Sequence, residues 1–280
     1  MFHRPQSTAE ALALLALDGA TILAGGTDVF PALVDRPPPK RLVDISLLND
    51  LRGISRQDKT VRIGAATTWA EIARADLPPC FDMLRQAALE IGAVQIQNRG
   101  TIGGNLCNAS PAADGAPPLL ALDALVELLS PRGVRNLPLQ DFLIGNRRTA
   151  RAADEIMTAI LVPVEDGASR SVFLKLGARK HLVISIVMVA AMLTVDLDGA
   201  IEKARIAIGS ASAVAQRLHG VEQRLAGLPA TAAIVDSVAL EDFRTLSPID
   251  DARATANYRT EAAFELVRRA FAHLTQPLDG

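Results

Sequence analysis

Hydrophobic residues recur with a helical period in two parts of the first 92 residues, and short apolar stretches of strand length separate these parts. Ser7 and Glu10 have the spacing of a capping box and precede an Ala/Leu-rich run to residue 17, which predicts a helix that ends at Asp18-Gly19. Residues 81–91 also have helical spacing and stop at Gly92, and a shorter helix is expected after Thr68. Strands are predicted at 21–23, 41–45 and 61–65.

Neither helical nor strand periodicity is present between residues 95 and 118, where four glycines and three prolines occur among Asn and Ser residues. This composition predicts a long loop, and a structureless loop of that length inside a compact protein is usually functional. An apolar segment follows at 119–129, and residues 163–169 are typical of a connection between domains.

The second half of the chain has a different pattern. Residues 184–195 predict a buried strand or a pair of strands, Asp198-Gly199 is a hairpin signal, and 204–208 alternate as a returning strand would. Helices are expected at about 213–227, 229–240 and 252–274. The chain is therefore predicted to be α+β, with an N-terminal domain over 1–165 and a smaller α+β C-terminal domain over 170–280.

The composition narrows the classes of function. The 280 residues include 29 Lys and Arg and 31 Asp and Glu, so the chain has no excess of positive charge for a nucleic-acid partner. Aromatic residues make up only 4%, which argues against a surface that stacks on bases. Cys80 and Cys107 cannot supply the four thiolates of a ferredoxin-type iron–sulfur cluster, and the four histidines lack metal-ligand spacing. The N-terminus has no signal-peptide core, and the apolar run at 182–195 is shorter than the roughly 20 residues of a membrane span. We expect a soluble, cytoplasmic protein with reduced thiols.

Two glycine pairs carry the strongest indication of function. Gly25-Gly26 follows a predicted strand, and Gly103-Gly104 lies 78 residues further along the chain. Paired glycines allow positive φ and a close approach of the backbone to a ligand, and successive N–H groups in such a turn bind anions. Neither pair has the spacing of a Rossmann fingerprint or a P-loop. The remaining interpretation is a dinucleotide whose pyrophosphate is held by two glycine turns.

Two charged residues have two interpretations each. Asp114 is either a surface turn residue or a carboxylate that accepts hydrogen bonds from sugar or ribityl hydroxyls. Lys175, between apolar neighbours, is either a solubilising charge on an edge strand or an ammonium that faces an electron-rich carbonyl in a ligand cleft.

Together these motifs resemble one family, the FAD-binding medium subunit of molybdenum hydroxylases, which includes the xanthine dehydrogenase and carbon monoxide dehydrogenase group. Residues 22–28 are similar to the family's first pyrophosphate loop and residues 98–105 to its second. The run from Asn108 to Asp114 and the segment 117–123 are also similar, so the resemblance covers nearly the whole chain.

The resemblance implies a two-part FAD-binding domain of the vanillyl-alcohol oxidase (PCMH) type, with lobes at about 1–56 and 57–165, followed by the C-terminal domain. In this family both glycine loops bind the diphosphate through backbone amides, the residue that matches Asp114 binds FAD hydroxyls, and the residue that matches Lys175 lies near the isoalloxazine. The cofactor-binding residues implied are Ile22, Leu23, Ala24, Gly25, Gly26, Thr27, Asp28, Ile91, Thr101, Gly103, Gly104, Asn105, Asp114, Met157 and Lys175.

The resemblance also implies partners. A small subunit with two [2Fe–2S] clusters and a large molybdopterin subunit would complete a heterotrimer, usually doubled, in which electrons pass from the clusters to FAD and on to NAD⁺, a quinone or another acceptor. The benzoyl-CoA reductase branch is disfavoured, because this chain has no cysteine-rich insertion. A stand-alone flavin oxidoreductase and a non-catalytic, nucleotide-binding assembly protein are the alternatives.

Overall fold

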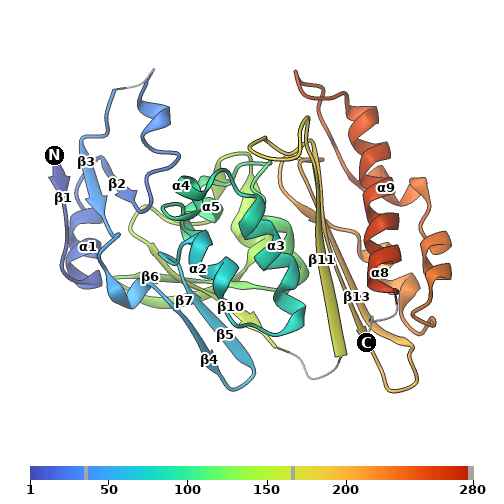
Figure 1. The fold of residues 1–280 in the computed structure, drawn as a ribbon. Helices are drawn as coiled ribbons and strands as arrows, with labels where there is room; N and C mark the ends of the chain where they lie inside the picture. Colours follow the sequence, from blue (N-terminus) through green and yellow to red (C-terminus); the bar gives the residue numbers. More distant parts are fainter. Residues whose placement is uncertain (35–36, 165–167, 277–280) are drawn as a thin grey trace. The chain divides into compact units, whose positions relative to one another are not determined.

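The computed structural model describes residues 1–34, 37–164 and 168–276, and these belong to two compact units (Figure 1). The first unit comprises Met1–Ala75, Ala93–Ala109 and Asp123–Val164. The second comprises Asp76–Gly92, Ser110–Leu122 and Glu165–Gly280. The chain therefore enters each unit more than once, so segments far apart in sequence form each of them.

The first unit begins with a small parallel sheet. Its strands β1 (Phe2–His3), β3 (Arg41–Asp44) and β2 (Ala20–Leu23) are ordered β1-β3-β2, and helix α1 (Thr8–Leu15) packs on β2 and β3. The predicted cap of α1 is present, since Ser7 Oγ accepts the Glu10 N–H and the Glu10 carboxylate accepts the Gln6 N–H. Short 3₁₀ turns, η1 (Pro31–Leu33) and η2 (Asn49–Leu51), complete this part.

A five-stranded antiparallel sheet forms the rest of the first unit. The order is β4 (Ile54–Gln57), β5 (Thr60–Gly64), β10 (Ile156–Pro163), β6 (Leu125–Ser130) and β7 (Gly133–Pro138). β10 enters last yet occupies the centre, pairing with β5 and β6. The connecting elements are α2 (Trp69–Arg74), α4 (Val94–Gln97), α5 (Ile102–Asn108), α7 (Leu139–Phe142), β8 (Leu143–Gly145) and β9 (Arg148–Thr149).

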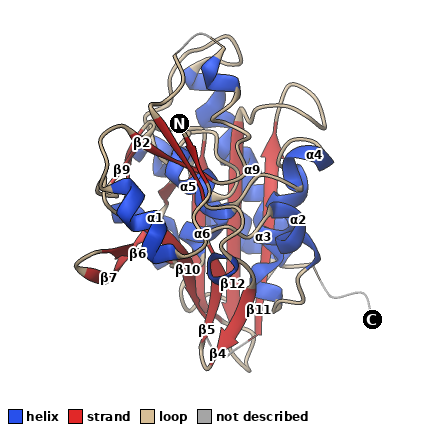
Figure 2. Cartoon of the chain, turned by 90° about the vertical axis from the view of Figure 1, so that its left-hand side faces the viewer, coloured by secondary structure: helices blue, strands red, loops and turns tan. Residues whose placement is uncertain are grey.

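The second unit is built on an antiparallel meander. β11 (Ala168–Leu176), β12 (Val187–Val195), β13 (Ile201–Gly209) and β14 (Gln216–Arg217) follow each other in order, and β11 and β12 run side by side (Figure 2). The hairpin signal at Asp198-Gly199 is confirmed, with Gly199 at a φ of +80°.

Helices cover both faces of this meander. α9 (Ala256–Leu274) lies on one side of β11 and α3 (Asp82–Glu90) on the other (Figure 1), and α6 (Ala116–Ala121) packs on β12 and β13. Alternate residues such as Val187 and Val189 join the core under α9, whereas Met188 faces Pro117 of α6. Because side chains alternate along a strand, Lys175 lies on the face opposite to the one that Leu174 and Leu176 present to α9.

Two expectations about secondary structure are wrong. The segment 95–118 is not a structureless loop, since it contains α5, most of α4 and the start of α6. The expected helices at 213–227 and 229–240 are replaced by β14, α8 (His219–Leu225) and the 3₁₀ turns η4 (Ala232–Ser237) and η5 (Leu240–Thr245). Helices of four to seven residues are marginal alone and depend on tertiary packing, so their sequence signals are weak.

The other predicted elements are present, with ends shifted by a few residues. β2, β3 and β5 form at the three predicted strand positions, and α2, α3 and α9 at the predicted helices. Within the described part of the chain, no helix combines the length and apolar character needed to cross a membrane.

Candidate cofactor-binding site

The first glycine segment leaves the end of β2, and its two glycines are required for different reasons. Gly26 has a φ of +75°, and a Cβ there would lie 2.5 Å from the ring of Phe30. Gly25 has an ordinary φ, but a Cβ would lie 1.8 Å from the carbonyl oxygen of Arg99. One glycine makes the turn and the other allows the second glycine segment to pack against it.

Backbone N–H groups of this segment are free to bind a ligand. Among the described residues, no acceptor takes the N–H of Gly25, Gly26, Thr27 or Asp28, although the carbonyl groups of Gly26 and Asp28 accept the N–H groups of downstream residues. Unpaired backbone donors need a partner, from water or from a ligand. A run of successive free N–H groups is suited to an anion such as a diphosphate.

The second glycine segment is the first turn of α5, and its amides are already used. Ile102 and Gly103 donate to the carbonyl groups of Thr67 and Ala65, and Gly104 and Asn105 donate to Thr101, the N-cap residue. A Cβ at Gly103 would lie 2.7 Å from Ala65. Positive φ is therefore not a feature of both glycine pairs. Among the glycines at 25, 26, 100, 103 and 104, only Gly26 has a positive φ.

The two glycine segments nevertheless lie together. Gly25 contacts the backbone of Arg99 and Gly100, and Thr27 Oγ1 is 3.5 Å from the position of a Gly100 Cβ. Asn105 Oδ1 is buried and has no hydrogen-bond partner in the described chain. An orphaned acceptor in α5 and the run of free donors after β2 are polar groups of the kind that the hydroxyl and phosphate groups of a cofactor satisfy.

A chain of side-chain hydrogen bonds, in which Asn108 and Arg147 are not among the predicted site residues, anchors the first segment at Asp28. Asn108, at the end of α5, donates from Nδ2 to Asp28 Oδ1 over 2.9 Å and accepts from Arg147 Nη1 over 2.7 Å. Arg147 has a φ of +53°, and its N–H donates to the carbonyl of Ala109. Asn108 belongs to the run that the sequence singled out, but nothing local assigned it this partner.

In the second unit, Asp114 and Lys175 form a buried ion pair. Lys175 Nζ lies 2.8 Å from Asp114 Oδ2 and also donates to the carbonyl of Glu90 over 3.1 Å. Ser185 Oγ donates to Asp114 Oδ1 over 2.6 Å. The side chains of Lys175 and Asp114 are 6% and 10% exposed, so neither the surface-turn nor the solubilising-charge interpretation holds.

Burial dominates the electrostatics of this pair. Removal from water raises the pKa of Asp114, and the charge of Lys175 and the hydrogen bonds from Lys175 and Ser185 oppose that rise. Each carboxylate oxygen retains a lone pair beyond these contacts, so Asp114 can still accept a hydrogen bond from a ligand hydroxyl.

The remaining predicted residues have different settings. Ile91 is half-buried and directly follows Glu90, whose carbonyl binds Lys175. Met157 is buried in β10 of the first unit, beside a register irregularity between Met157 and Ala159. Of the three residues that lead into the first glycine segment, Leu23 is buried, whereas Ile22 and Ala24 are half-buried and pack against the core under α1.

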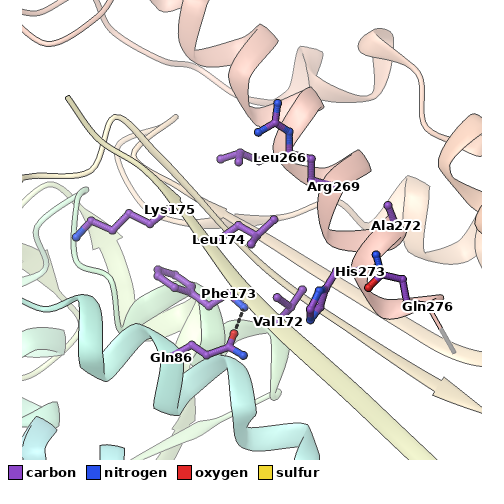
Figure 3. A pocket seen from close by; sticks show the side chains of 10 residues that line it. All are labelled: Gln86, Val172, Phe173, Leu174, Lys175, Leu266, Arg269, Ala272, His273 and Gln276. Atoms are coloured by element: carbon purple, nitrogen blue, oxygen red, sulfur yellow. Dashed lines mark hydrogen bonds between the residues drawn. The ribbon is translucent and has the colours of Figure 1, made fainter. Parts of the chain in front are cut away.

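A pocket of about 630 Å³ in the second unit is separate from the Asp114 carboxylate. It lies along β11, with Gln86 of α3 at one side and the last turns of α9 at the other. Gln86 Oε1 accepts the Phe173 N–H over 2.7 Å, and Lys175 points away from the α9 residues (Figure 3). Lys175 lines the pocket, but Asp114, Ser185 and Glu90 do not.

Comparison with known proteins agrees with these features. A family model described as the FAD binding domain in molybdopterin dehydrogenase matches residues 1–165, and the CO dehydrogenase flavoprotein C-terminal domain matches 172–274. The nicotinate dehydrogenase FAD-subunit of Eubacterium barkeri is 33% identical over 287 residues, covering 100% of this chain and 97% of the relative. The carbon monoxide dehydrogenase medium chain of Hydrogenophaga pseudoflava is 33% identical, with 96% and 94% covered.

Solved structures give the same result. Reconstituted CO dehydrogenase from Oligotropha carboxidovorans superposes with a TM-score of 0.91 at 32% identity, covering 98% of this chain and 96% of that one. The fold is that of a CO dehydrogenase medium chain, with an FAD-binding domain and a flavoprotein C-terminal domain. The chain belongs to the FAD-binding medium subunits of the molybdenum hydroxylases, the family of xanthine and carbon monoxide dehydrogenases, and is an oxidoreductase subunit that binds FAD.

Proposed function

We propose that this chain is the electron-transfer flavoprotein subunit of a molybdenum hydroxylase, which takes electrons from [2Fe–2S] clusters of a partner subunit and passes them through FAD to NAD⁺ or another acceptor. Family membership supports the FAD, and relatives named as an FAD-subunit and a medium chain support a place in a larger assembly. The observation in this chain that carries the proposal is the run of free N–H groups from Gly25 to Asp28, packed against Arg99 and Gly100.

The first unit would hold the diphosphate of FAD. The N–H groups of Gly25, Gly26, Thr27 and Asp28 are the donors, and Asn105 Oδ1 is an acceptor for a hydroxyl. Gly103 acts indirectly, because its lack of a Cβ allows the start of α5 to pack against Ala65, and Gly25 in the same way allows the backbone of Arg99 to come close. When bound, FAD supplies a ring that accepts and releases electrons, and the task of the protein is to hold and orient it.

Asp114 and Lys175 of the second unit would bind polar groups of the cofactor. Asp114 contacts Lys175 Nζ over 2.8 Å, and Ser185 and the Glu90 carbonyl fix the geometry of the pair. Lys175 can then offer a positive charge to an electron-rich carbonyl of the ring, while Asp114 accepts from a hydroxyl. Ile91 and Met157 would contribute apolar contacts.

The expected partners are an iron–sulfur small subunit and a molybdopterin large subunit, assembled as a dimer of heterotrimers. Two cysteines cannot ligate a ferredoxin-type cluster in this chain, so the clusters would be held by the partner. A cytoplasmic location is part of the same proposal.

The first test is a visible absorption spectrum of the chain purified alone, after incubation with FAD and desalting. Oxidised-flavin bands at about one FAD per chain are expected. A folded but colourless chain would contradict the proposed site in the isolated subunit.

A second test distinguishes the alternatives. Protein isolated under native conditions should carry iron and molybdenum in addition to flavin. Flavin with substrate oxidation but without either metal would instead establish a stand-alone flavin oxidoreductase. Nucleotide binding with no redox activity would establish an assembly protein.

A further inference from the structure

Arg259, in the first turns of α9, is 3% exposed although it carries a charge. Its Nη1 donates to the carbonyl of Ile186 over 2.5 Å and to the carbonyl of Ser210 over 3.1 Å. Its Nη2 donates to Asp251 Oδ1 over 2.7 Å. A guanidinium this deeply buried must be paired, and here one planar group joins three segments of the second unit.

Both carbonyl groups that Arg259 binds lie next to groups that hold the Asp114 segment. Ile186 directly follows Ser185, whose hydroxyl donates to Asp114 Oδ1 over 2.6 Å. The N–H of Ser210 donates to the carbonyl of Pro111 over 3.0 Å, three residues before Asp114. The guanidinium therefore lies next to one contact of the Asp114 carboxylate, through Ser185, and next to one backbone contact of the segment before it, through Ser210, without touching the carboxylate itself.

The arrangement is not the one that would stabilise the fold most. Ser210 has a φ of +62°, a conformation that non-glycine residues rarely adopt. Ser210 Oγ and Arg259 Nε are both buried without a hydrogen-bond partner in the described chain. Strain and unpaired polar atoms cost stability, and they persist where the surrounding structure holds a functional geometry.

We propose that Arg259 is a positioning residue for the cofactor site, which keeps the Ser185 hydroxyl on Asp114 and thereby leaves the other carboxylate oxygen on Lys175. This inference rests on the proposed contact of Asp114 and Lys175 with FAD. Loss of the Arg259 guanidinium lets the Asp114 carboxylate reorient, which displaces the Lys175 side chain. Both the affinity for FAD and the reduction potential of the bound flavin then change.

The test is a double-mutant cycle on the full chain, with FAD affinity and flavin midpoint potential as readouts. Arg259→Lys keeps the charge but loses the planar fork that reaches three acceptors, and Ser185→Ala removes the hydroxyl that contacts Asp114. Each single variant is expected to bind FAD roughly tenfold more weakly and to shift the potential in the same direction. The double variant should bind FAD no more weakly than the single variant with the lower FAD affinity, because both substitutions break the same chain of contacts from Arg259 through Ser185 to Asp114.

The matched control is Arg269→Lys, on the same helix, where Arg269 is 68% exposed and pairs with Glu265. It should leave both readouts unchanged. Additive effects in the double variant, or an Arg259→Lys protein with native affinity and potential, would overturn the proposal. If Arg259→Lys does not fold, Asp251→Asn releases the second arm of the same guanidinium and must shift the potential as Ser185→Ala does.

The variant Asp114→Asn distinguishes a failure of this inference from a failure of the proposed function. An unchanged affinity and potential in Asp114→Asn would contradict the contact of Asp114 with FAD itself. If Asp114→Asn and Ser185→Ala both change the readouts while Arg259→Lys does not, the cofactor contact stands and the positioning role of Arg259 is rejected.

Discussion

A Cβ at Gly25 would lie 1.8 Å from the carbonyl oxygen of Arg99, whereas a Cβ at Gly104 would meet only Thr101 Oγ1, at 2.8 Å. Gly104 is also exposed, unlike Gly103, which is buried against Ala65. The glycines that look equivalent in the two motifs thus have distinct tasks. Gly25 and Gly103 allow backbone segments to pack together, whereas under the proposed function Gly104 would keep the surface of α5 clear for a ligand.

This difference predicts opposite outcomes for two substitutions. Gly104→Val should keep its fold, with a loss of at most about 1 kcal/mol from the disturbed N-cap, but should lose FAD because its side chain occupies the ligand side. Gly25→Ala should lower the melting temperature, because a backbone contact must open. Flavin content per chain and thermal unfolding measure the two effects. A folded Gly104→Val protein with full flavin occupancy would contradict the assignment.

At the scale of elements, the loop before α9 shows how one carboxylate organises a helix entry. Asp251 accepts the N–H groups of Arg253 and Ala254 and the guanidinium groups of Arg253 and Arg259. The hydrogen bond from the Arg253 N–H, followed by those from Ala254, Arg259 and Arg253, lowers the pKa of Asp251 from 3.8 to about 2. The ionised form is therefore the one that the folded state stabilises.

The stability that Asp251 contributes should depend on pH in a defined window. A carboxyl whose pKa is lowered on folding stabilises the folded state above its unfolded pKa, 3.8, and loses that effect as pH falls through about 2. The difference in unfolding free energy between the native chain and Asp251→Asn should shrink from pH 4 to pH 2 in denaturant titrations. Asp236→Asn, at a carboxylate that is 85% exposed, is the control and should differ little from the native chain throughout. A constant difference for Asp251→Asn would refute the prediction.

At the scale of the whole molecule, FAD should act as a stabilising ligand, because each group of residues proposed to bind it comes together only in the folded chain. The Gly25 segment meets Arg99 across more than seventy residues, and Asp114 meets Lys175 across sixty-one. Neither arrangement persists in an unfolded chain, so binding energy adds to folding energy.

The size of this effect can be tested by thermal unfolding with added ligand. FAD at 100 times its dissociation constant should stabilise the chain by about 2.7 kcal/mol, which raises the melting temperature by several degrees. ADP, which supplies only the diphosphate and adenosine, should give a smaller rise through the Gly25–Asp28 amides. Riboflavin, without phosphate, serves as the control for those amides. A melting temperature that FAD leaves unchanged would rule out a preformed site.

Local signals in the sequence determined much of this protein. The caps at Ser7 and Thr68, the hairpin at Asp198-Gly199 and the glycine pairs depend on residues a few positions apart, so they can be identified without the fold. The family could be identified in the same way, because its motifs are short and linear. The division of domains near residue 165 stays a prediction.

Tertiary structure decided the rest, since it depends on contacts that sequence spacing does not encode. Gly26 and Gly103 both belong to Gly-Gly pairs, but among the described residues the Gly26 N–H is free, whereas the Gly103 N–H donates to the carbonyl of Ala65, far away in the sequence. Two features arise from contacts between residues 27 to 103 positions apart in the sequence. They are the central position of β10 between β5 and β6 and the burial of Asp114 with Lys175 and Ser185. Short helices such as α5 form because packing outweighs their weak intrinsic preference, which is why a sequence rich in glycine predicted a loop there.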